Sequence, residues 1–201
     1  MNEHLRNIQA ALHGLGYEAG PVDGQWGAKT KIALQQLVLD GGPAPERPVA
    51  PGGTIYQGHT PVREIIVHCA ATATGWMEGR SLEDKIREIT AWHRKRGFAT
   101  IGYHWVIDRD GRVLPGRKET EIGAHVEGHN MGTIGISLIG GATSKETDKF
   151  AKNYTPAQDA ALRKLIGEIK GRTQITKISG HNQYASKACP GFYVPQWLAE
   201  K

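Results

Sequence analysis

The sequence contains few cysteines and no long hydrophobic run. Its 201 residues include only Cys69 and Cys189, too few for a scaffold of several disulfides. No segment approaches the roughly 18 to 20 consecutive apolar residues that a membrane-spanning helix needs, so we expect no stable membrane insertion. The first residues lack the basic segment, apolar run and cleavage site of a secretory signal peptide. We therefore expect a chain without a signal peptide that stays in the cytoplasm unless something releases it.

The remaining composition is that of an ordinary globular protein. Hydrophobic residues make up 39% of the chain and charged residues 22%, which excludes a disordered or fibrous class. The length suits one catalytic domain with a small additional domain. A formal charge of +5 favours an anionic partner, which composition alone leaves open among nucleic acid, a membrane surface and an acidic wall polymer.

Proline and glycine are concentrated in residues 41–53, which predicts a linker between two domains. We place a helical module at 1–42, the linker at 43–60 and a larger domain at 61–201. The module has two patterns of helical spacing, separated by turn residues at 16–24. The residues at helical spacing are Leu5, Ile8, Leu12 and Leu15 in the first pattern and Ile32, Ala33, Gln36 and Leu37 in the second.

The larger domain alternates predicted strands and helices. Short apolar runs at 65–67, 134–139 and 175–178 predict buried strands, and an Asp110-Gly111 turn predicts a hairpin of 103–107 with 112–114. Helices are predicted after Ser81 and after Thr155, where Pro156 and Gln158 complete a strong helix start. This alternation predicts an α/β fold with a mixed central β-sheet flanked by helices.

Three residues of the larger domain have the chemistry of a zinc site. His68 and His181 each follow a predicted strand, and Cys189 lies eight residues after His181. A catalytic zinc ion uses three such protein ligands and keeps a fourth position open. The spacing alone leaves other interpretations open: Cys189 in a disulfide with Cys69 or as a buried thiol, and His68 as a core histidine.

Five motifs in order make residues 62–198 resemble the type-2 N-acetylmuramoyl-L-alanine amidases, the family of the T-seven phage lysozyme and the peptidoglycan recognition proteins. The motifs are IIVHCAAT (65–72), GYHWVI (102–107), GAH with GHN (123–125 and 128–130), IGI (134–136) and KACPG (187–191). Residues 5–38 resemble a small three-helix peptidoglycan-binding domain; the alternative is a helical spacer or a dimerisation element.

The resemblance assigns roles to individual residues. It implies that His68, His181 and Cys189 bind one zinc ion, with Tyr103 and Lys187 as catalytic residues beside it. Lys187 would stabilise the oxyanion, and Tyr103 would orient water or donate to the same oxyanion. A family segment near the cleft matches three more residues, so we expect substrate contacts from His125, His129 and Asn130.

The implied activity is hydrolysis of the amide between N-acetylmuramic acid and L-alanine in bacterial peptidoglycan. The absence of export signals favours a modular phage endolysin. Such a protein would wait in the host cytoplasm, reach the wall through a holin and cause lysis. We expect a monomer that binds peptidoglycan and no nucleic acid.

Three other functions compete with the amidase. A wall-binding protein without catalysis is disfavoured because the non-catalytic relatives typically lack the cysteine ligand that Cys189 matches. A regulator of RNA polymerase would need a surface that no segment of the sequence identifies. A glycosidase would need two carboxylates on either side of the scissile bond, and no convincing pair is present.

Overall fold

The computed structural model describes residues 2–14, 16–39 and 53–200, which fall into two compact units. One unit comprises residues 1–48 and the other residues 49–201. Leu15 and most of the predicted linker lie outside the described residues. No helix in the described ranges is long and apolar enough to cross a membrane.

The described part of the N-terminal unit contains two helices, α1 (Glu3–Gly14) and α2 (Ala28–Leu39), where the resemblance implied three. Their small core contains Leu12, Ala19 and Ala33. The buried Gln9 side chain organises the connecting segment: its Nε2 donates to Asp23 Oδ1, and its Oε1 accepts from the Gly24 N–H. These bonds hold Asp23 and Gly24 of the segment between α1 and α2 against α1.

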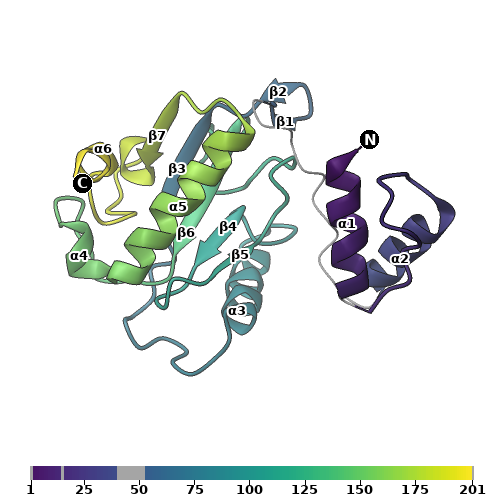
Figure 1. The fold of residues 1–201 in the computed structure, drawn as a ribbon. Coiled ribbons are helices and arrows are strands. Elements are labelled where there is room, and N and C mark those ends of the chain that lie inside the picture. Colours follow the sequence, from purple (N-terminus) through teal and green to yellow (C-terminus); the bar gives the residue numbers. More distant parts are fainter. Residues whose placement is uncertain (1, 15, 40–52, 201) are drawn as a thin grey trace. The chain divides into compact units, whose positions relative to one another are not determined.

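The second unit is built on a mixed sheet of five strands (Figure 1), as the sequence predicts. The strand order is β5-β4-β6-β3-β7. Four neighbouring strands, β4, β6, β3 and β7, run parallel, and β5 pairs antiparallel with β4 at one edge. The strands span Glu64–Cys69 (β3), Trp105–Ile107 (β4), Val113–Pro115 (β5), Thr133–Leu138 (β6) and Lys177–Gly180 (β7).

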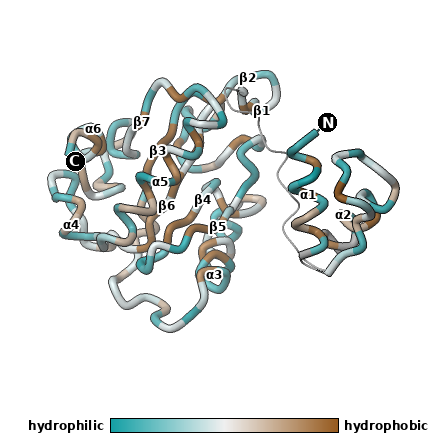
Figure 2. Tube along the Cα trace, viewed as in Figure 1, coloured by the Kyte–Doolittle hydropathy of each residue, from teal (hydrophilic) through white to brown (hydrophobic). Residues whose placement is uncertain are grey.

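Helices cover both faces of this sheet, and hydrophobic residues gather along its central strands (Figure 2). The main core packs α5 (Pro156–Arg172), α4 (Phe150–Asn153) and α6 (Val194–Ala199) on one face. A second cluster packs α3 (Leu82–Lys95) on the other face, where Leu82 and Ile89 belong to the same cluster as Val106. Burial on both faces agrees with the apolar run Ile65–Val67 in β3 and with the burial of every residue of β6.

The two long helices begin at the residues that the sequence predicts. The Ser81 hydroxyl accepts from the Asp84 N–H at the start of α3. Thr155 and Gln158 form a complete capping box at the start of α5. Both caps satisfy backbone N–H groups that have no partner within the helix.

The predicted linker extends too far, because residues 53–60 are already part of the second unit. They include β1 (Tyr56–Gln57) and the start of its antiparallel partner β2 (Thr60–Pro61). Ile55 is buried in the main core, and the Gln57 side chain is buried among backbone groups. Gln57 Nε2 donates to the Thr133 carbonyl at 2.8 Å, and its Oε1 accepts from the Gly132 N–H at 2.8 Å.

A buried ion pair joins α3 to the end of β4. Lys85 Nζ lies 2.8 Å from both carboxylate oxygens of Asp108. The two side chains are only 9% and 3% exposed. Each charge is stabilised by the other, because a charged group that is buried away from water without a charged partner strongly destabilises the fold.

We predict that Lys85→Met lowers the free energy of unfolding of the second unit by about 3 to 5 kcal/mol, because it leaves the buried Asp108 carboxylate with only a 3.9 Å contact to the half-exposed Arg112 guanidinium. Urea unfolding followed by tryptophan fluorescence measures this change. Lys164→Met is the matched control: Lys164 is 79% exposed and 3.9 Å from Glu168, so its loss should cost no more than about 1 kcal/mol. Equal effects of the two substitutions would contradict the prediction.

Candidate metal centre

Parallel strands bring His68 and His181 to the same edge of the sheet. His68 is the fifth residue of β3, and His181 directly follows β7. Val67 pairs with Gly180 in the parallel register, so the two histidines come next on adjacent strands. Their ring centroids are 4.8 Å apart. The carboxyl ends of parallel strands are where α/β sheets usually place their ligands.

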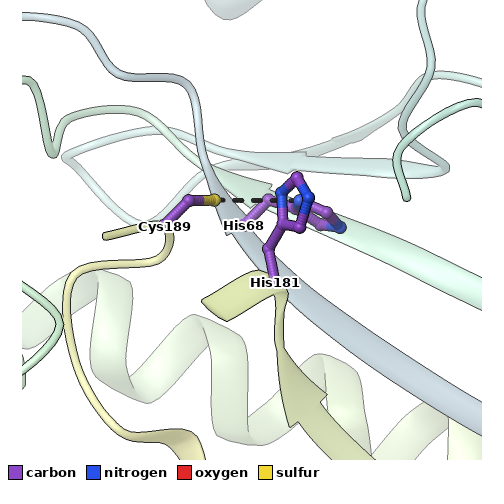
Figure 3. Close-up of side chains that lie close together, drawn as sticks. All are labelled: His68, His181 and Cys189. Atoms are coloured by element: carbon purple, nitrogen blue, oxygen red, sulfur yellow. Dashed lines mark hydrogen bonds between the residues drawn. The ribbon is translucent and has the colours of Figure 1, made fainter. Parts of the chain in front are cut away.

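Cys189 reaches this pair from the loop that follows β7 (Figure 3). Its Sγ lies 3.8 Å from His68 Nδ1, and the three potential ligand atoms all lie within 4.8 Å of one another. Tetrahedral zinc, with bonds of about 2.0 Å to nitrogen and 2.3 Å to sulfur, separates two such ligands by roughly 3.6 Å. The donor set and its spacing therefore fit zinc. Both cysteines are free thiols, so the disulfide alternative is not realised.

Burial keeps the ligand imidazoles neutral at neutral pH. It lowers the pKa of His68 well below its usual value, and the nearby His125 and His181 lower it further. Burial and then the Lys187 ammonium lower the pKa of His181. A neutral imidazole has a free lone pair for a metal ion. The Cys69 backbone N–H donates to Cys189 Sγ at 3.2 Å and orients this third ligand.

His181 and Cys189 line a pocket of about 820 Å³ between α3 and the loops at 124–130 and 181–189, and His68 is fully buried next to them. Tyr103 and Lys187 line the same pocket. The Tyr103 ring centroid is 5.2 Å from that of His68. Burial, followed by the charges of the two cysteines, raises the pKa of Tyr103, so its hydroxyl remains protonated at neutral pH. It can therefore donate a hydrogen bond but is a poor base.

The three expected substrate contacts occupy different environments. His125 is 8% exposed, and its Nδ1 lies 3.0 Å from His68 Nε2. The Asn130 Oδ1 accepts from the N–H groups of His125 and Val126, although the residue also lines the pocket. His129 is exposed and packs against Tyr184, with 4.4 Å between the ring centroids.

Sequence reasoning did not identify several other residues of the site. Arg96 and Phe98 also line the pocket, and the Arg96 guanidinium lies 5.3 Å from the centre of the Phe98 ring. Thr133 Oγ1 lies 3.4 Å from His125 Nε2, behind the pocket. The only feature of the sequence that could have pointed to Thr133 is its place directly before the IGI motif. Arg96, at the end of α3, has the sequence context of an ordinary charged helix terminus.

Comparison with known proteins agrees with this geometry. Residues 58–192 match the family model described as N-acetylmuramoyl-L-alanine amidase, and residues 1–39 match a putative peptidoglycan binding domain. An endolysin of Escherichia phage T7 is 39% identical over 133 residues, covering 66% of this chain and 83% of its own. A peptidoglycan-recognition protein of Drosophila melanogaster is 33% identical over 138 residues, covering 67% of this chain and 71% of its own.

Solved structures share the fold. The N-acetylmuramoyl-L-alanine amidase LysC from Clostridium intestinale superimposes with a TM-score of 0.57 at 22% identity, over 77% of this chain and 92% of its own. The Drosophila peptidoglycan recognition protein SD gives a TM-score of 0.56 at 22% identity, over 73% and 86% of the two chains. At this identity the similarity concerns the arrangement of sheet and helices.

Gly135 leaves the space that the His125 ring fills, so we predict that Gly135→Ala disrupts the site. A Cβ at this position would lie 2.6 Å from two carbon atoms of the ring, closer than any relaxed contact. We expect a loss of stability of roughly 1 to 3 kcal/mol and weaker zinc binding. Thermal unfolding and metal titration measure the two effects.

Gly167→Ala is the control for this substitution. Gly167 is exposed in α5, and an added Cβ would meet nothing within 4 Å. The change should stabilise the helix by about 0.5 to 1 kcal/mol and leave zinc binding unchanged. Normal metal affinity in Gly135→Ala would contradict the packing argument.

Proposed function

The chain belongs to the N-acetylmuramoyl-L-alanine amidase family, and we propose that His68, His181 and Cys189 bind the zinc ion of its active site. The protein hydrolyses the amide between N-acetylmuramic acid and L-alanine in peptidoglycan. One observation carries the zinc proposal: the two neutral imidazoles and the cysteine lie close together beside the pocket. The distance from His68 Nδ1 to Cys189 Sγ is 3.8 Å. Imidazole with thiolate favours zinc over magnesium or calcium.

When bound, zinc polarises the substrate carbonyl and activates water for attack on it. The protein supplies three ligands on rigid or anchored backbone, because His68 lies in β3, His181 follows β7 and the Cys69 N–H fixes Cys189. Two of these residues, His181 and Cys189, also line the pocket. A substrate amide can approach from the pocket without displacing a ligand.

Lys187 and Tyr103 are the proposed catalytic residues beside the metal. The Lys187 ammonium is close enough to lower the pKa of both ligand histidines, so its charge acts on the site. A positive charge there stabilises the oxygen that becomes negative in the tetrahedral intermediate. The protonated Tyr103 hydroxyl can donate a hydrogen bond to the same oxygen. Asn130 and His129, at and near the pocket, remain proposed substrate contacts.

We predict that Cys189→Ala abolishes both zinc binding and amide cleavage. The lost stabilisation of the transition state should reduce the rate by at least about 1,000-fold. Atomic absorption measures zinc per chain, and new L-alanine amino ends released from sacculi measure cleavage. Cys69→Ala is the control, because it removes the neighbouring thiol but keeps the backbone N–H that donates to Cys189 Sγ. Full activity of Cys189→Ala would refute the ligand assignment, and new reducing sugars would identify a glycosidase.

We further propose that the protein acts as an endolysin on the cell wall of a phage host. The similarity to phage endolysins supports this role. In this proposal the protein is a monomer, remains in the host cytoplasm until a holin permeabilises the membrane, and then reaches peptidoglycan. Its partners are then peptidoglycan and no nucleic acid.

The N-terminal unit is proposed to bind peptidoglycan, leaving catalysis to residues 61–201. The match of residues 1–39 to a putative peptidoglycan binding domain supports this role. Three large apolar side chains of the unit are exposed: Val22, Trp26 and Ile32. An indole that is 48% exposed, as in Trp26, offers an apolar face for sugar rings or peptide side chains.

We predict that Trp26→Ala weakens binding to sacculi by roughly 5- to 30-fold, as expected for an aromatic residue that contributes more than about 1 kcal/mol to an interface. Co-sedimentation of the full chain carrying Cys189→Ala measures binding without cleavage. Tyr193→Ala is the control, because Tyr193 is 52% exposed but lies in the second unit. Equal binding of the two variants would support the spacer alternative for the N-terminal unit.

A further inference from the structure

Three buried side chains, His68, His125 and Thr133, are connected in series by polar contacts, and we call them the line. His68 Nε2 lies 3.0 Å from His125 Nδ1, and His125 Nε2 lies 3.4 Å from Thr133 Oγ1. The residues are 0%, 8% and 5% exposed, respectively. Each imidazole nitrogen in this line must therefore find its partner inside the protein.

The Thr133 hydroxyl determines the direction of the hydrogen bonds. Its Oγ1 lies 3.0 Å from the His129 carbonyl oxygen and 2.9 Å from the Asn130 carbonyl oxygen. Carbonyl oxygens only accept, so the single hydroxyl proton points to them. The opposite arrangement would place hydroxyl lone pairs against two carbonyl oxygens at these short distances. Thr133 Oγ1 therefore accepts from His125 Nε2–H.

This direction fixes the tautomers of both histidines. A neutral imidazole with its proton on Nε2 has a lone pair on Nδ1, so His125 Nδ1 accepts from His68 Nε2–H. His68 then has its own lone pair on Nδ1, the atom that lies 3.8 Å from Cys189 Sγ. The nitrogen that faces the other ligands is thus the one that can bind a metal.

Neighbouring groups keep His125 in this arrangement. His104 packs edge-on against His125, but its Nδ1 accepts from the Gly135 N–H and its Nε2 donates to the Glu121 carbonyl. His104 therefore has no proton or lone pair left for His125. Asn130 Oδ1 holds the backbone N–H of His125.

We propose that His125 and Thr133 are positioning residues that hold His68 in the Nε2–H tautomer, with its Nδ1 lone pair directed at the zinc ion. The inference rests on the proposed zinc site and revises the expected substrate-binding role of His125. Outer hydrogen-bond partners of this kind typically contribute about 10- to 100-fold to metal affinity or activity. Neither side chain needs to touch substrate.

Nitrogen-15 NMR of the zinc-free full chain tests the tautomers without any metal. We expect the Nε2 of both His68 and His125 to carry the proton and both Nδ1 atoms to be unprotonated. A proton on His68 Nδ1 would overturn the proposal. This measurement needs only the wild-type chain, so it decides the question even if a variant fails to fold.

Substitution of Thr133 tests the contribution of the line to zinc binding. Thr133→Val removes the acceptor for His125 Nε2–H and should raise the zinc dissociation constant by about 10- to 100-fold. Thr133→Ser keeps the hydroxyl and should remain within about twofold of wild type. Competition with a chromogenic chelator measures both. Equal zinc affinities of the two variants would overturn the proposal, given the same folded circular-dichroism spectrum.

The outcomes separate this inference from the proposed function. A wild-type chain with the expected tautomers that binds no zinc would refute the metal site and leave the tautomer assignment intact. A wild-type chain that binds zinc and cleaves the amide, but has the opposite tautomers, would refute the inference alone.

Discussion

The parallel pairing of β3 with β7 is the constraint on which the site depends. It places Val67 beside Gly180, so the residues that follow them, His68 and His181, are the two histidines of the proposed metal site. Side chains alternate between the faces of a strand, and a slip of one residue in β3 would turn His68 toward the main core. Ile65 and Val67 belong to the main core and would leave it in such a slip, so packing on that face favours the observed register. The same hydrophobic packing that stabilises the sheet therefore sets the ligand geometry.

Much of this fold follows from local sequence patterns. The apolar runs at 65–67 and 134–139 predict β3 and β6, and the Thr155 capping box predicts the start of α5 to the residue. The last strand begins two residues later than predicted, at Lys177 instead of Ile175. Its pairing starts opposite Glu64, and Ile175 packs against the core outside the ladder. The prediction of a buried strand at 175–178 was only partly correct, because Ile175 and Ile178 are half-buried and the pairing with β3 begins at Lys177.

Long-range contacts account for what the sequence did not predict. Gln57 is a polar residue after a Pro/Gly-rich segment, yet it satisfies backbone groups more than 60 residues away. The ligand set came from ordered motifs, since any two histidines and a cysteine have similar local chemistry. His125 belongs to such a motif, but its hydrogen bond to His68 spans 57 residues. No local pattern distinguishes a residue that supports a ligand from one that contacts substrate.

The charges of the site are arranged by depth. Burial lowers the pKa of His104 to about 4 and that of His125 to about 3, so the groups behind His68 stay neutral at neutral pH. The positive charges, Arg96 and Lys187, lie at exposed positions around the pocket. A cation bound by neutral imidazoles would be repelled by further charge in the low-dielectric interior. In the proposed site, neutral histidines next to His68 and cationic side chains at the solvent side would together allow the binding of a dication and the stabilisation of an oxyanion.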